Sequence, residues 1–420
     1  MNPGEKLDKL NQLLAHCKNA PFYRNRLPAR PLSSLEQLRS IPLTTKEDLR
    51  RESPFGLIAV PPAELFQYHE SFGTTGTPVS VWLTQEDQRD HARELADWGV
   101  AFQPHDVVMI RFPYAISSAA HVVQTAATAN HSCIIPAGSR STVSPFPKVI
   151  QWLRDLKVTL LTCMPLQALL IAEAAAMLGL DPRRDFPALR AIGTAGETLS
   201  PSRRRMLQDI WGRPVYDHFG MTEIGAAVID CVYGEPHPAT AYFIFELLGD
   251  DLQTEAAPGE LGNLVITTLC RRGTPLVRYL TGDRARLLTK DCPCGKRQIM
   301  EIHGRREFTI AVGNRVWDIW DLEAIIAHLP CRRFWVAGPV DGGLSFVVEQ
   351  EKETDLISPQ LVADLENRYR IPLRFKVVPK GTLYDRSQLL RDEAVGQPQY
   401  IYPASQIAAK AHLHKDPQQV

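Results

Sequence analysis

The stretch ALRAIGTAGETLSPSRRRMLQDIWGRPVYDHFG, residues 188–220, decides the fold class of this chain. It predicts a short apolar strand over residues 191–194, a helix over 201–211 and a second strand over 215–219. The same alternation begins upstream, with strands predicted over residues 107–112, 132–136 and 158–163 and helices over 119–129, 147–156 and 165–178. Apolar strands that alternate with helices predict an α/β fold, in which a largely parallel sheet is covered by helices on both faces.

The segments on either side of this region predict further parts. Upstream, the first 50 residues are predicted to be helical, and another helix is predicted over residues 85–102. After Glu223, short alternating strands with glycine turns predict a β-rich subdomain that ends near residue 305. From residue 306 the pattern predicts a small α+β domain. We therefore expect a large N-terminal domain over residues 1–305, a small C-terminal domain over 306–402 and a disordered tail over 403–420.

The composition excludes several classes of function. Of the 420 residues, 44% are hydrophobic, and 47 basic residues balance 47 acidic ones. A balanced charge gives no general attraction to nucleic acid or to an anionic membrane. The N-terminus lacks the apolar run of a signal peptide, and no segment reaches the ~18 apolar residues of a membrane span. We expect a cytoplasmic protein with reduced thiols. The sequence does not fix the oligomeric state, and a homodimer is one of the alternatives.

Four short motifs carry candidate chemistry. Residues 71–78, SFGTTGTP, predict a turn in which glycines direct backbone N–H groups toward an anion, although an ordinary hairpin loop explains this motif equally well. Residues 216–223, YDHFGMTE, supply a ring for stacking, a hydroxyl for a phosphate and a carboxylate for Mg²⁺. Residues 278–283, RYLTGD, contain an aspartate that can accept ribose hydroxyls. The fourth motif is the Gly304–Arg305 pair.

The order of these motifs resembles that of the adenylate-forming superfamily, and most closely its phenylacetate-CoA ligase branch. Other pieces similar to that branch are NAPFYRNRL near the start, IPLTTKEDLR, TAGETLSPSRRRML and GELGNLVITTLCRRGTPLVRYLTGD. The resemblance implies the acyl-adenylate synthetase fold, and a reaction in which ATP activates a small carboxylic acid as an acyl-AMP. The acyl group would then pass to the thiol of CoA or of a carrier protein, or to an amine.

The resemblance also assigns roles to individual residues. Those expected around the nucleotide are Ser71, Gly73, Thr74, Thr75 and Gly76 of the phosphate loop, Gly196 and Glu197 beside the adenine, and His218, Phe219 and Gly220 on its flanks. Thr222 would bond the α-phosphate, and Glu223 would bind Mg²⁺. Asp283 would hold the ribose, and Arg305 would precede the hinge to the small domain. Catalysis would come from positioning and electrostatics, because the acid is already ionised at neutral pH.

Three residues are candidates for the acyl site. The resemblance places Ala195 at the floor of the acyl pocket, and it places Tyr114 and His121, within FPYAISSAAHVV, facing the substrate. His121 would neutralise the substrate carboxylate before attack, and a buried structural histidine explains this residue equally well. The small residues between Tyr114 and His121 leave room for a ring, so we expect an aromatic or other cyclic acid.

Four residues in two turns have the spacing of zinc ligands. Cys292 and Cys294 form a C-x-C pair, and Cys231 precedes His237 by six positions in another turn. Three thiolates and one imidazole would complete a closed tetrahedral site of the structural type. Relatives in the same branch carry zinc–thiolate sites. The alternative is four unrelated turn residues.

The sequence departs from the family pattern at two places. Thr77 stands where the phosphate loop usually carries a lysine or arginine, and no lysine stands near residues 388–389, where the family carries its catalytic one. Lys380 is the nearest lysine, and Arg386 and Arg391 are the candidate substitutes. Removing one such charge lowers a rate roughly a hundredfold. The alternative to a working ligase is therefore a degenerate member that binds nucleotide or acyl-adenylate without efficient turnover.

Overall fold

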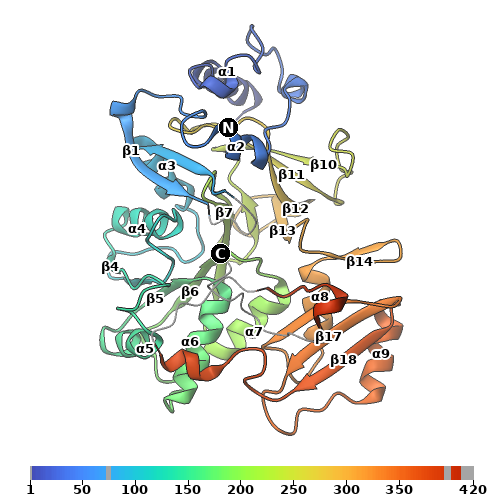
Figure 1. The fold of residues 1–420 in the computed structure, drawn as a ribbon. Helices are drawn as coiled ribbons and strands as arrows, with labels where there is room; N and C mark the ends of the chain where they lie inside the picture. The colour runs from blue at the N-terminus through green and yellow to red at the C-terminus, as the bar shows by residue number, and fades with distance from the viewer. Residues whose placement is uncertain (1, 72–76, 392–398, 408–420) are drawn as a thin grey trace.

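The predicted α/β core is present in the structure, a computed structural model that describes residues 2–71, 77–391 and 399–407. Its largest sheet has seven strands in the order β4-β3-β5-β6-β7-β8-β9 (Figure 1). The first five of these strands are parallel, and the last two pair antiparallel. The strands are β3 (Val107–Ile110), β4 (Cys133–Ile135), β5 (Leu160–Cys163), β6 (Ala191–Ala195), β7 (Val215–Met221), β8 (Gly225–Asp230) and β9 (Pro236–Pro238).

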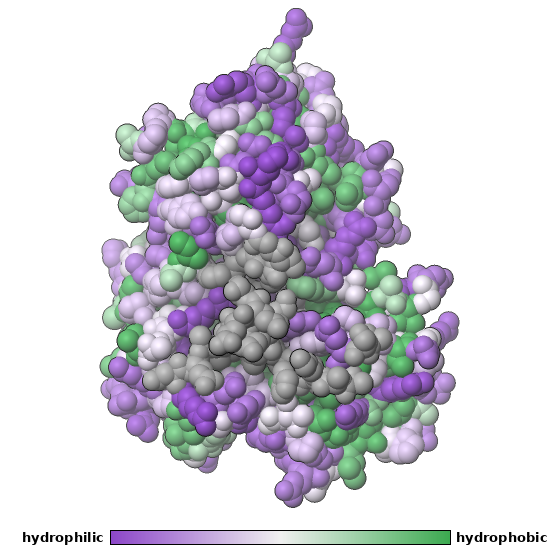
Figure 2. Space-filling model, in the orientation of Figure 1, coloured by the Kyte–Doolittle hydropathy of each residue, from purple (hydrophilic) through white to green (hydrophobic). Residues whose placement is uncertain are grey.

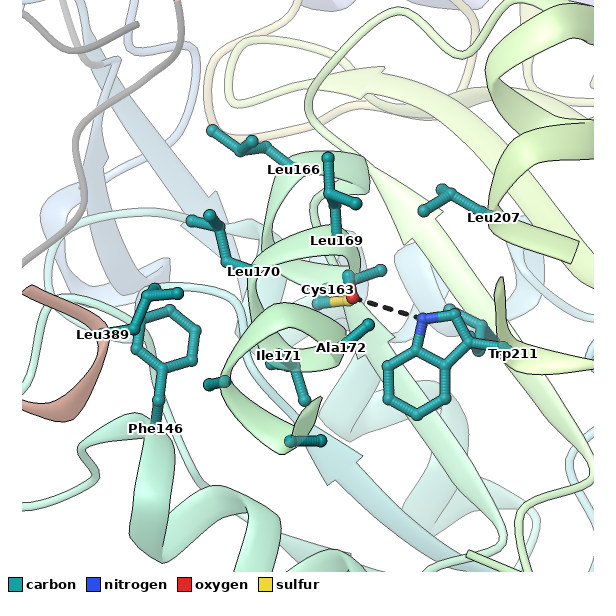
Figure 3. Close-up of a cluster of buried hydrophobic side chains, with 14 of the residues drawn as sticks. Phe146, Cys163, Leu166, Leu169, Leu170, Ile171, Ala172, Leu207, Trp211 and Leu389 are labelled. Atoms are coloured by element: carbon teal, nitrogen blue, oxygen red, sulfur yellow. Dashed lines mark hydrogen bonds between the residues drawn. The ribbon is translucent and has the colours of Figure 1, made fainter. Parts of the chain in front are cut away.

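Helices pack against this sheet. They are α3 (Gln85–Glu94), α4 (Ala119–Ala129), α5 (Phe146–Asp155), α6 (Pro165–Met177) and α7 (Pro201–Trp211). Helix α6 is buried from Pro165 to Ala175 and lies at the centre of the core shown in Figure 3, where the Trp211 indole donates to the Ala168 carbonyl at 3.2 Å. The helix predicted over 85–102 ends at Glu94, because the chain turns so that the Gly99 N–H donates to the Asp230 carbonyl at the end of β8.

A second sheet and the N-terminal segment share another core. The sheet is antiparallel, in the order β10 (Phe243–Leu248), β11 (Leu261–Thr268), β12 (Tyr279–Thr289) and β13 (Gln298–Arg305). The segment contains α1 (Pro3–Cys17), η1 (Pro21–Tyr23), η2 (Leu35–Ser40), α2 (Lys46–Glu52), η3 (Pro62–Glu64) and the hairpin of β1 (Leu65–Glu70) and β2 (Ser80–Thr84). Leu10 and Leu14 of α1 belong to the same buried cluster as Ile266 and Tyr279 of the sheet.

The C-terminal part has a three-stranded sheet with its own apolar cluster. It contains β14 (Ile310–Val312), β15 (Arg315–Trp317), α8 (Ile319–Ile326), β16 (Trp335–Val340), β17 (Gly343–Glu349), α9 (Pro359–Tyr369) and β18 (Leu373–Val378). Leu322, Trp335 and Phe346 are among the residues of that cluster. A domain boundary near residue 305 stays a prediction.

Residues 386–390 and 399–407 lie against the large sheet's helices and the C-terminal sheet. Leu389 of η4 (Arg386–Leu390) is fully buried and reaches the core of α5 and α6 beside Phe146 (Figure 3). Further on, Tyr400 stacks on Trp335, and helix α10 (Ala404–Ile407) follows with Ile407 buried. Ile407 belongs to the apolar cluster that also contains Phe146 and Leu389, and the tail predicted over residues 403–420 stays a prediction. Residues 408–420 lie outside the described residues.

A buried ion pair also joins the C-terminal part to the large sheet. Arg203 of α7 places Nε 2.5 Å from Glu323 of α8, and Ser200 donates its hydroxyl to the same carboxylate at 2.5 Å. Arg203 also donates to the Tyr400 hydroxyl. Both charges of the pair are buried, so the loss of either partner would leave an uncompensated charge.

The outer surface is mixed. On the face in Figure 2, hydrophilic residues cover much of the surface, and apolar residues form separate patches between them. Within the described ranges, no helix combines the length and the apolar character that a membrane span needs.

Candidate active site

The candidate nucleotide residues gather where two parallel strands end. Strands β6 and β7 are neighbours, and Ala195 pairs with His218 in their register. Gly196 and Glu197 follow the end of β6, while Phe219 and Gly220 lie at the end of β7. The carboxyl edge of a parallel sheet is the usual position of a ligand site in α/β proteins. The fold therefore brings these two predicted groups to one edge.

Glu223 and Asp283 meet from different sheets. Glu223 follows β7 and is 4% exposed, and Tyr279 of β12 places its hydroxyl 3.5 Å from Glu223 Oε1. Asp283 of β12 is buried, with Arg305 Nε at 3.4 Å from Oδ1. The other carboxylate oxygen, Oδ2, has no hydrogen-bond partner among the described residues. A buried carboxylate oxygen without a partner can accept a hydrogen bond from a ligand hydroxyl.

Lys46 is the site residue that the sequence reasoning missed. Its Nζ lies 3.8 Å from Glu223 Oε1. Burial raises the pKa of Asp283, and the charges of Arg305 and Lys46 act against that rise. The position of Lys46 is fixed by Thr44, which pairs with Tyr279 and accepts the Leu280 N–H in its carbonyl at 2.9 Å. A signal was present in IPLTTKEDLR, where Lys46 directly follows the helix N-cap Thr45, but no motif connects this lysine to Glu223 far along the chain.

The phosphate loop is described only at its ends. The Ser71 N–H donates to the Val79 carbonyl at 3.0 Å, and the Val79 N–H donates to the Ser71 hydroxyl at 3.1 Å. Ser71 thus closes the base of the loop. The predicted phosphate ligands Gly73, Thr74, Thr75 and Gly76 lie outside the described residues, so their role stays a prediction.

Glu197 belongs to a buried charged group as well as to the predicted adenine site. The Leu166 N–H donates to Glu197 at 3.3 Å, and Arg203 Nη1 lies 3.7 Å away. Burial raises the pKa of Glu197 to about 7, although Arg203 opposes the rise. Because Arg203 also pairs with Glu323, the residue beside the predicted adenine is linked to the C-terminal part through one side chain.

His218 lies on the sheet face of Ala195. Residues paired in register on parallel strands project from the same face, and Phe219 projects from the opposite one. The His218 ring meets Trp98 edge-on at 4.7 Å, and burial lowers the pKa of His218 to about 3. Its Nδ1 has no hydrogen-bond partner among the described residues. This packing favours the acyl side for a neutral His218, and its predicted place beside the adenine stays untested.

Tyr114 and His121, the predicted acyl-site residues, lie together, and their role toward a substrate stays a prediction. The His121 ring accepts from the Gln67 amide at Nδ1 and donates to the Tyr114 carbonyl from Nε2, both at 3.0 Å. Both ring nitrogens are thus occupied, which favours the structural alternative for His121. The Tyr114 hydroxyl is buried without a partner in the described part of the chain, and burial raises the pKa of Tyr114 to about 12.

The four predicted zinc ligands form one cluster. The ligand atoms of Cys231, His237, Cys292 and Cys294 all lie within 4.8 Å of one another. Cys231 and Cys292 place their sulfurs 3.7 Å apart, and Cys294 Sγ lies 3.2 Å from His237 Nε2. His237 Nδ1 donates to the Gln298 carbonyl at 2.6 Å, which directs Nε2 toward the sulfurs. An imidazole fixed in this way is the usual orientation of a metal-binding histidine.

His303, two residues before Arg305, connects β13 to the start of α8. Its Nδ1 donates to Asp318 Oδ2 at 2.7 Å. Burial lowers the pKa of His303, but the hydrogen bond to Asp318 and the nearby Glu301 carboxylate outweigh this, so the pKa lies above the ordinary value of 6.5. A raised histidine pKa stabilises the fold fully below about pH 6.5, and this contribution is lost as pH rises through the folded pKa.

We therefore expect His303→Gln to reduce the difference in unfolding free energy between pH 6 and pH 8. Urea unfolding at both values measures this difference in the wild type and the variant. His105→Gln serves as control, because His105 is an exposed histidine. An unchanged pH difference in His303→Gln would contradict the expectation.

Comparison with known proteins agrees with this geometry. Residues 71–268 match the family model described as AMP-binding enzyme. The phenylacetate-coenzyme A ligase of Pseudomonas putida is 31% identical over 315 residues, covering 72% of this chain and 70% of the relative. The enzyme of the same name from Thermus thermophilus is 29% identical over 350 residues, covering 78% of this chain and 77% of the relative.

Solved structures agree on the fold. A 2-hydroxyisobutyryl-CoA ligase in its postadenylation state superposes with a TM-score of 0.85 at 20% identity, covering 96% of this chain and 90% of that one. The thioesterification state of that ligase, with 2-HIB-AMP and CoA, gives a TM-score of 0.68 over 96% of this chain and 89% of that one. The fold, the residues at the strand ends and the relatives lead to one conclusion: this chain belongs to the adenylate-forming family, in its phenylacetate-CoA ligase-like branch.

Proposed function

We propose that the chain uses ATP to convert a small carboxylic acid to an acyl-AMP, releases pyrophosphate, and then transfers the acyl group to CoA. The observation that carries this proposal is the pair of buried carboxylates, Glu223 and Asp283, with Lys46 and Arg305 beside them at the edge of the large sheet. CoA is the proposed acceptor because the two curated relatives described above are named as CoA ligases.

The chemistry follows from these charges. Asp283 would accept the ribose hydroxyls through its free Oδ2, which would fix the nucleotide relative to β12. Thr222 would donate to the α-phosphate, and Lys46 would bring a positive charge to the phosphates as the substrate carboxylate attacks. Glu223 would hold Mg²⁺, which when bound offsets the negative charge of the pyrophosphate. We assign no general base, because the acid is already ionised.

The acid is proposed to be an aromatic or cyclic one. Tyr114 offers a buried hydroxyl, and Ala195 and His218 share one sheet face near Trp98. A buried group without a partner costs free energy, so a substrate that bonds it is favoured over one that leaves it unpaired. A substrate whose ring packs near Trp98 and whose polar substituent bonds the Tyr114 hydroxyl would fit both features.

Zinc is proposed as a structural ion. Three thiolates and the imidazole of His237 are the donors that tetrahedral zinc prefers, and the ligand atoms lie within 4.8 Å of one another. Cys231 lies in the turn between β8 and β9, His237 lies on β9, and Cys292 and Cys294 lie in the turn between β12 and β13. Bound zinc would therefore join the seven-stranded sheet to the four-stranded sheet.

One observation favours the second candidate, a member that binds nucleotide without efficient turnover. Leu389 is fully buried in the core of α5 and α6, where the family would present its catalytic lysine. Arg386 is held by Glu173 and Glu349, and Lys380 lies 3.3 Å from Glu173. These contacts keep both cations at the opposite end of α6 from Met164 and the β6 edge.

Acid-dependent exchange between ATP and pyrophosphate separates the two candidates. We expect exchange with at least one acid from a panel of aromatic, heteroaromatic and alicyclic acids. Glu223→Ala should lower the exchange rate at least about a hundredfold, because the metal-binding carboxylate is lost. Glu260→Ala removes an exposed carboxylate and should retain exchange. ATP binding without exchange for any acid would favour the second candidate.

A further inference from the structure

The turn that carries Thr222 and Glu223 is held by more than its own hydrogen bonds. It joins β7 to β8 and ends at Gly225, which has a φ of +87°. A Cβ on Gly220 would lie 2.4 Å from the Gly225 carbonyl oxygen, so the two strands approach closely at this point. Small shifts of the backbone at residues 224–226 would therefore move the Glu223 carboxylate.

Two buried side chains bond the backbone on either side of Gly225. Arg271 donates from Nη2 to the Ile224 carbonyl at 2.6 Å. Glu94 accepts the Ala226 N–H at Oε2, at 3.0 Å. The two side chains also face each other, with Arg271 Nη2 3.6 Å from Glu94 Oε1, and each side chain is 3% exposed.

The space around Gly225 is occupied by these groups. A Cβ on Gly225 would lie 2.6 Å from Glu94 Oε2, 2.8 Å from His91 Nε2 and 2.9 Å from Arg271 Nη2. Polar atoms from α3 and from the loop between β11 and β12 thus converge on a single backbone position. Glycine is required here for both its conformation and its lack of a side chain.

Stability alone does not account for this arrangement. A buried ion pair is often no more stable than apolar residues of similar volume, because both charges lose their hydration. The pair at Glu94 and Arg271 is also not in close contact, at 3.6 Å. Its short hydrogen bonds go to the peptide groups directly after Glu223. What these two side chains fix, through their hydrogen bonds to the backbone, is the path of the turn.

We infer that Glu94 and Arg271 are positioning residues that hold the Thr222–Glu223 turn in place for magnesium and the α-phosphate. The inference rests on the proposed function for the role of that turn. Glu94 fixes the backbone after Gly225 by accepting the Ala226 N–H, and Arg271 fixes the backbone before Gly225 by donating to the Ile224 carbonyl. Neither side chain contacts substrate in this assignment, so both act through Glu223.

The test measures magnesium dependence in Glu94→Gln, Arg271→Met and Arg271→Lys. Calorimetry follows ATP binding as Mg²⁺ is varied, and pyrophosphate exchange gives kcat and KM for ATP. We expect Glu94→Gln and Arg271→Met to raise the half-saturating Mg²⁺ concentration about tenfold, the lower range for residues that orient metal ligands. We also expect kcat to fall more than KM rises, and Arg271→Lys to restore part of the loss because it keeps one donor and the charge.

Glu349→Gln is the matched control. Glu349 is a buried carboxylate that also accepts backbone N–H groups, from Leu383 and Tyr384, and it pairs with Arg386 in the C-terminal part. Thermal unfolding of every variant establishes that it is folded at the assay temperature. An unchanged magnesium requirement in folded Glu94→Gln and Arg271→Met, or an equal change in Glu349→Gln, would overturn the inference.

The binding measurement keeps this inference separate from the proposed function. A wild type that binds ATP with Mg²⁺ but activates no acid would overturn the proposed function, while the magnesium shift in the variants would still support the positioning role. A wild type without magnesium-dependent ATP binding would overturn both.

Discussion

Lys46→Met is expected to lower the rate of acid-dependent pyrophosphate exchange at least about a hundredfold. Lys46 lies beside the buried carboxylates, with Nζ 3.8 Å from Glu223 Oε1. The phosphate loop lacks a cation at Thr77, and the C-terminal segment has no lysine near residues 388–389. We therefore expect the positive charge of Lys46 to contribute a large part of the electrostatic stabilisation of the transition state.

Lys380→Met is the control, because it shows whether the positive charge at the phosphates comes from Lys46 or from the C-terminal part. Lys380 is the lysine nearest to the expected C-terminal position, and it pairs with Glu173 on α6. We expect Lys380→Met to keep most of the exchange activity and Lys46→Arg to recover part of it. If Lys380→Met loses the activity and Lys46→Met keeps it, the C-terminal part supplies the cation by a change of position.

Cys294→Ser is expected to release zinc and to lower the free energy of unfolding by about 4 kcal/mol or more, as the loss of a structural metal does. The thiolate is one of four ligands, and an uncharged serine hydroxyl is a poor replacement. Metal analysis of protein purified without added zinc gives the stoichiometry, and chemical unfolding gives the stability.

Cys133→Ser provides the comparison, because Cys133 is an exposed free cysteine outside the cluster. It should change neither the zinc content nor the stability. A wild-type protein that contains no zinc, or a Cys294→Ser variant that unfolds like the wild type, would refute the proposed zinc site.

Much of the fold was predictable because its signals are local. Helices over residues 119–129 and 201–211 have the predicted bounds, since apolar spacing marks their limits and a proline begins the second. One departure has a tertiary cause. The helix from Gln85 ends at Glu94, because the chain then turns so that the Gly99 N–H donates to the Asp230 carbonyl at the end of β8.

The candidate site was predictable only where motifs name its residues. The cysteine spacing led to the cluster of Cys231, His237, Cys292 and Cys294, and the structure brings all four ligand atoms together. Lys46 was not found, because its partner Glu223 lies far along the chain and Thr44 sets their distance by pairing with β12. The face on which His218 projects was also hidden, since it depends on the register of β6 and β7.

The anchoring of the C-terminal part has a consequence for the speed of turnover. Withdrawing a buried leucine such as Leu389 costs about 2–5 kcal/mol by analogy with leucine-to-alanine substitutions, and leaving one partner of a buried pair such as Arg203 and Glu323 alone costs about 3–5 kcal/mol. These buried contacts therefore hold the small sheet in its place beside helices α5, α6 and α7. A reaction cycle that reorients the small sheet has to detach Leu389 and Tyr400 first. The slowest conformational step of such a cycle would lie at this anchor, far from the phosphates.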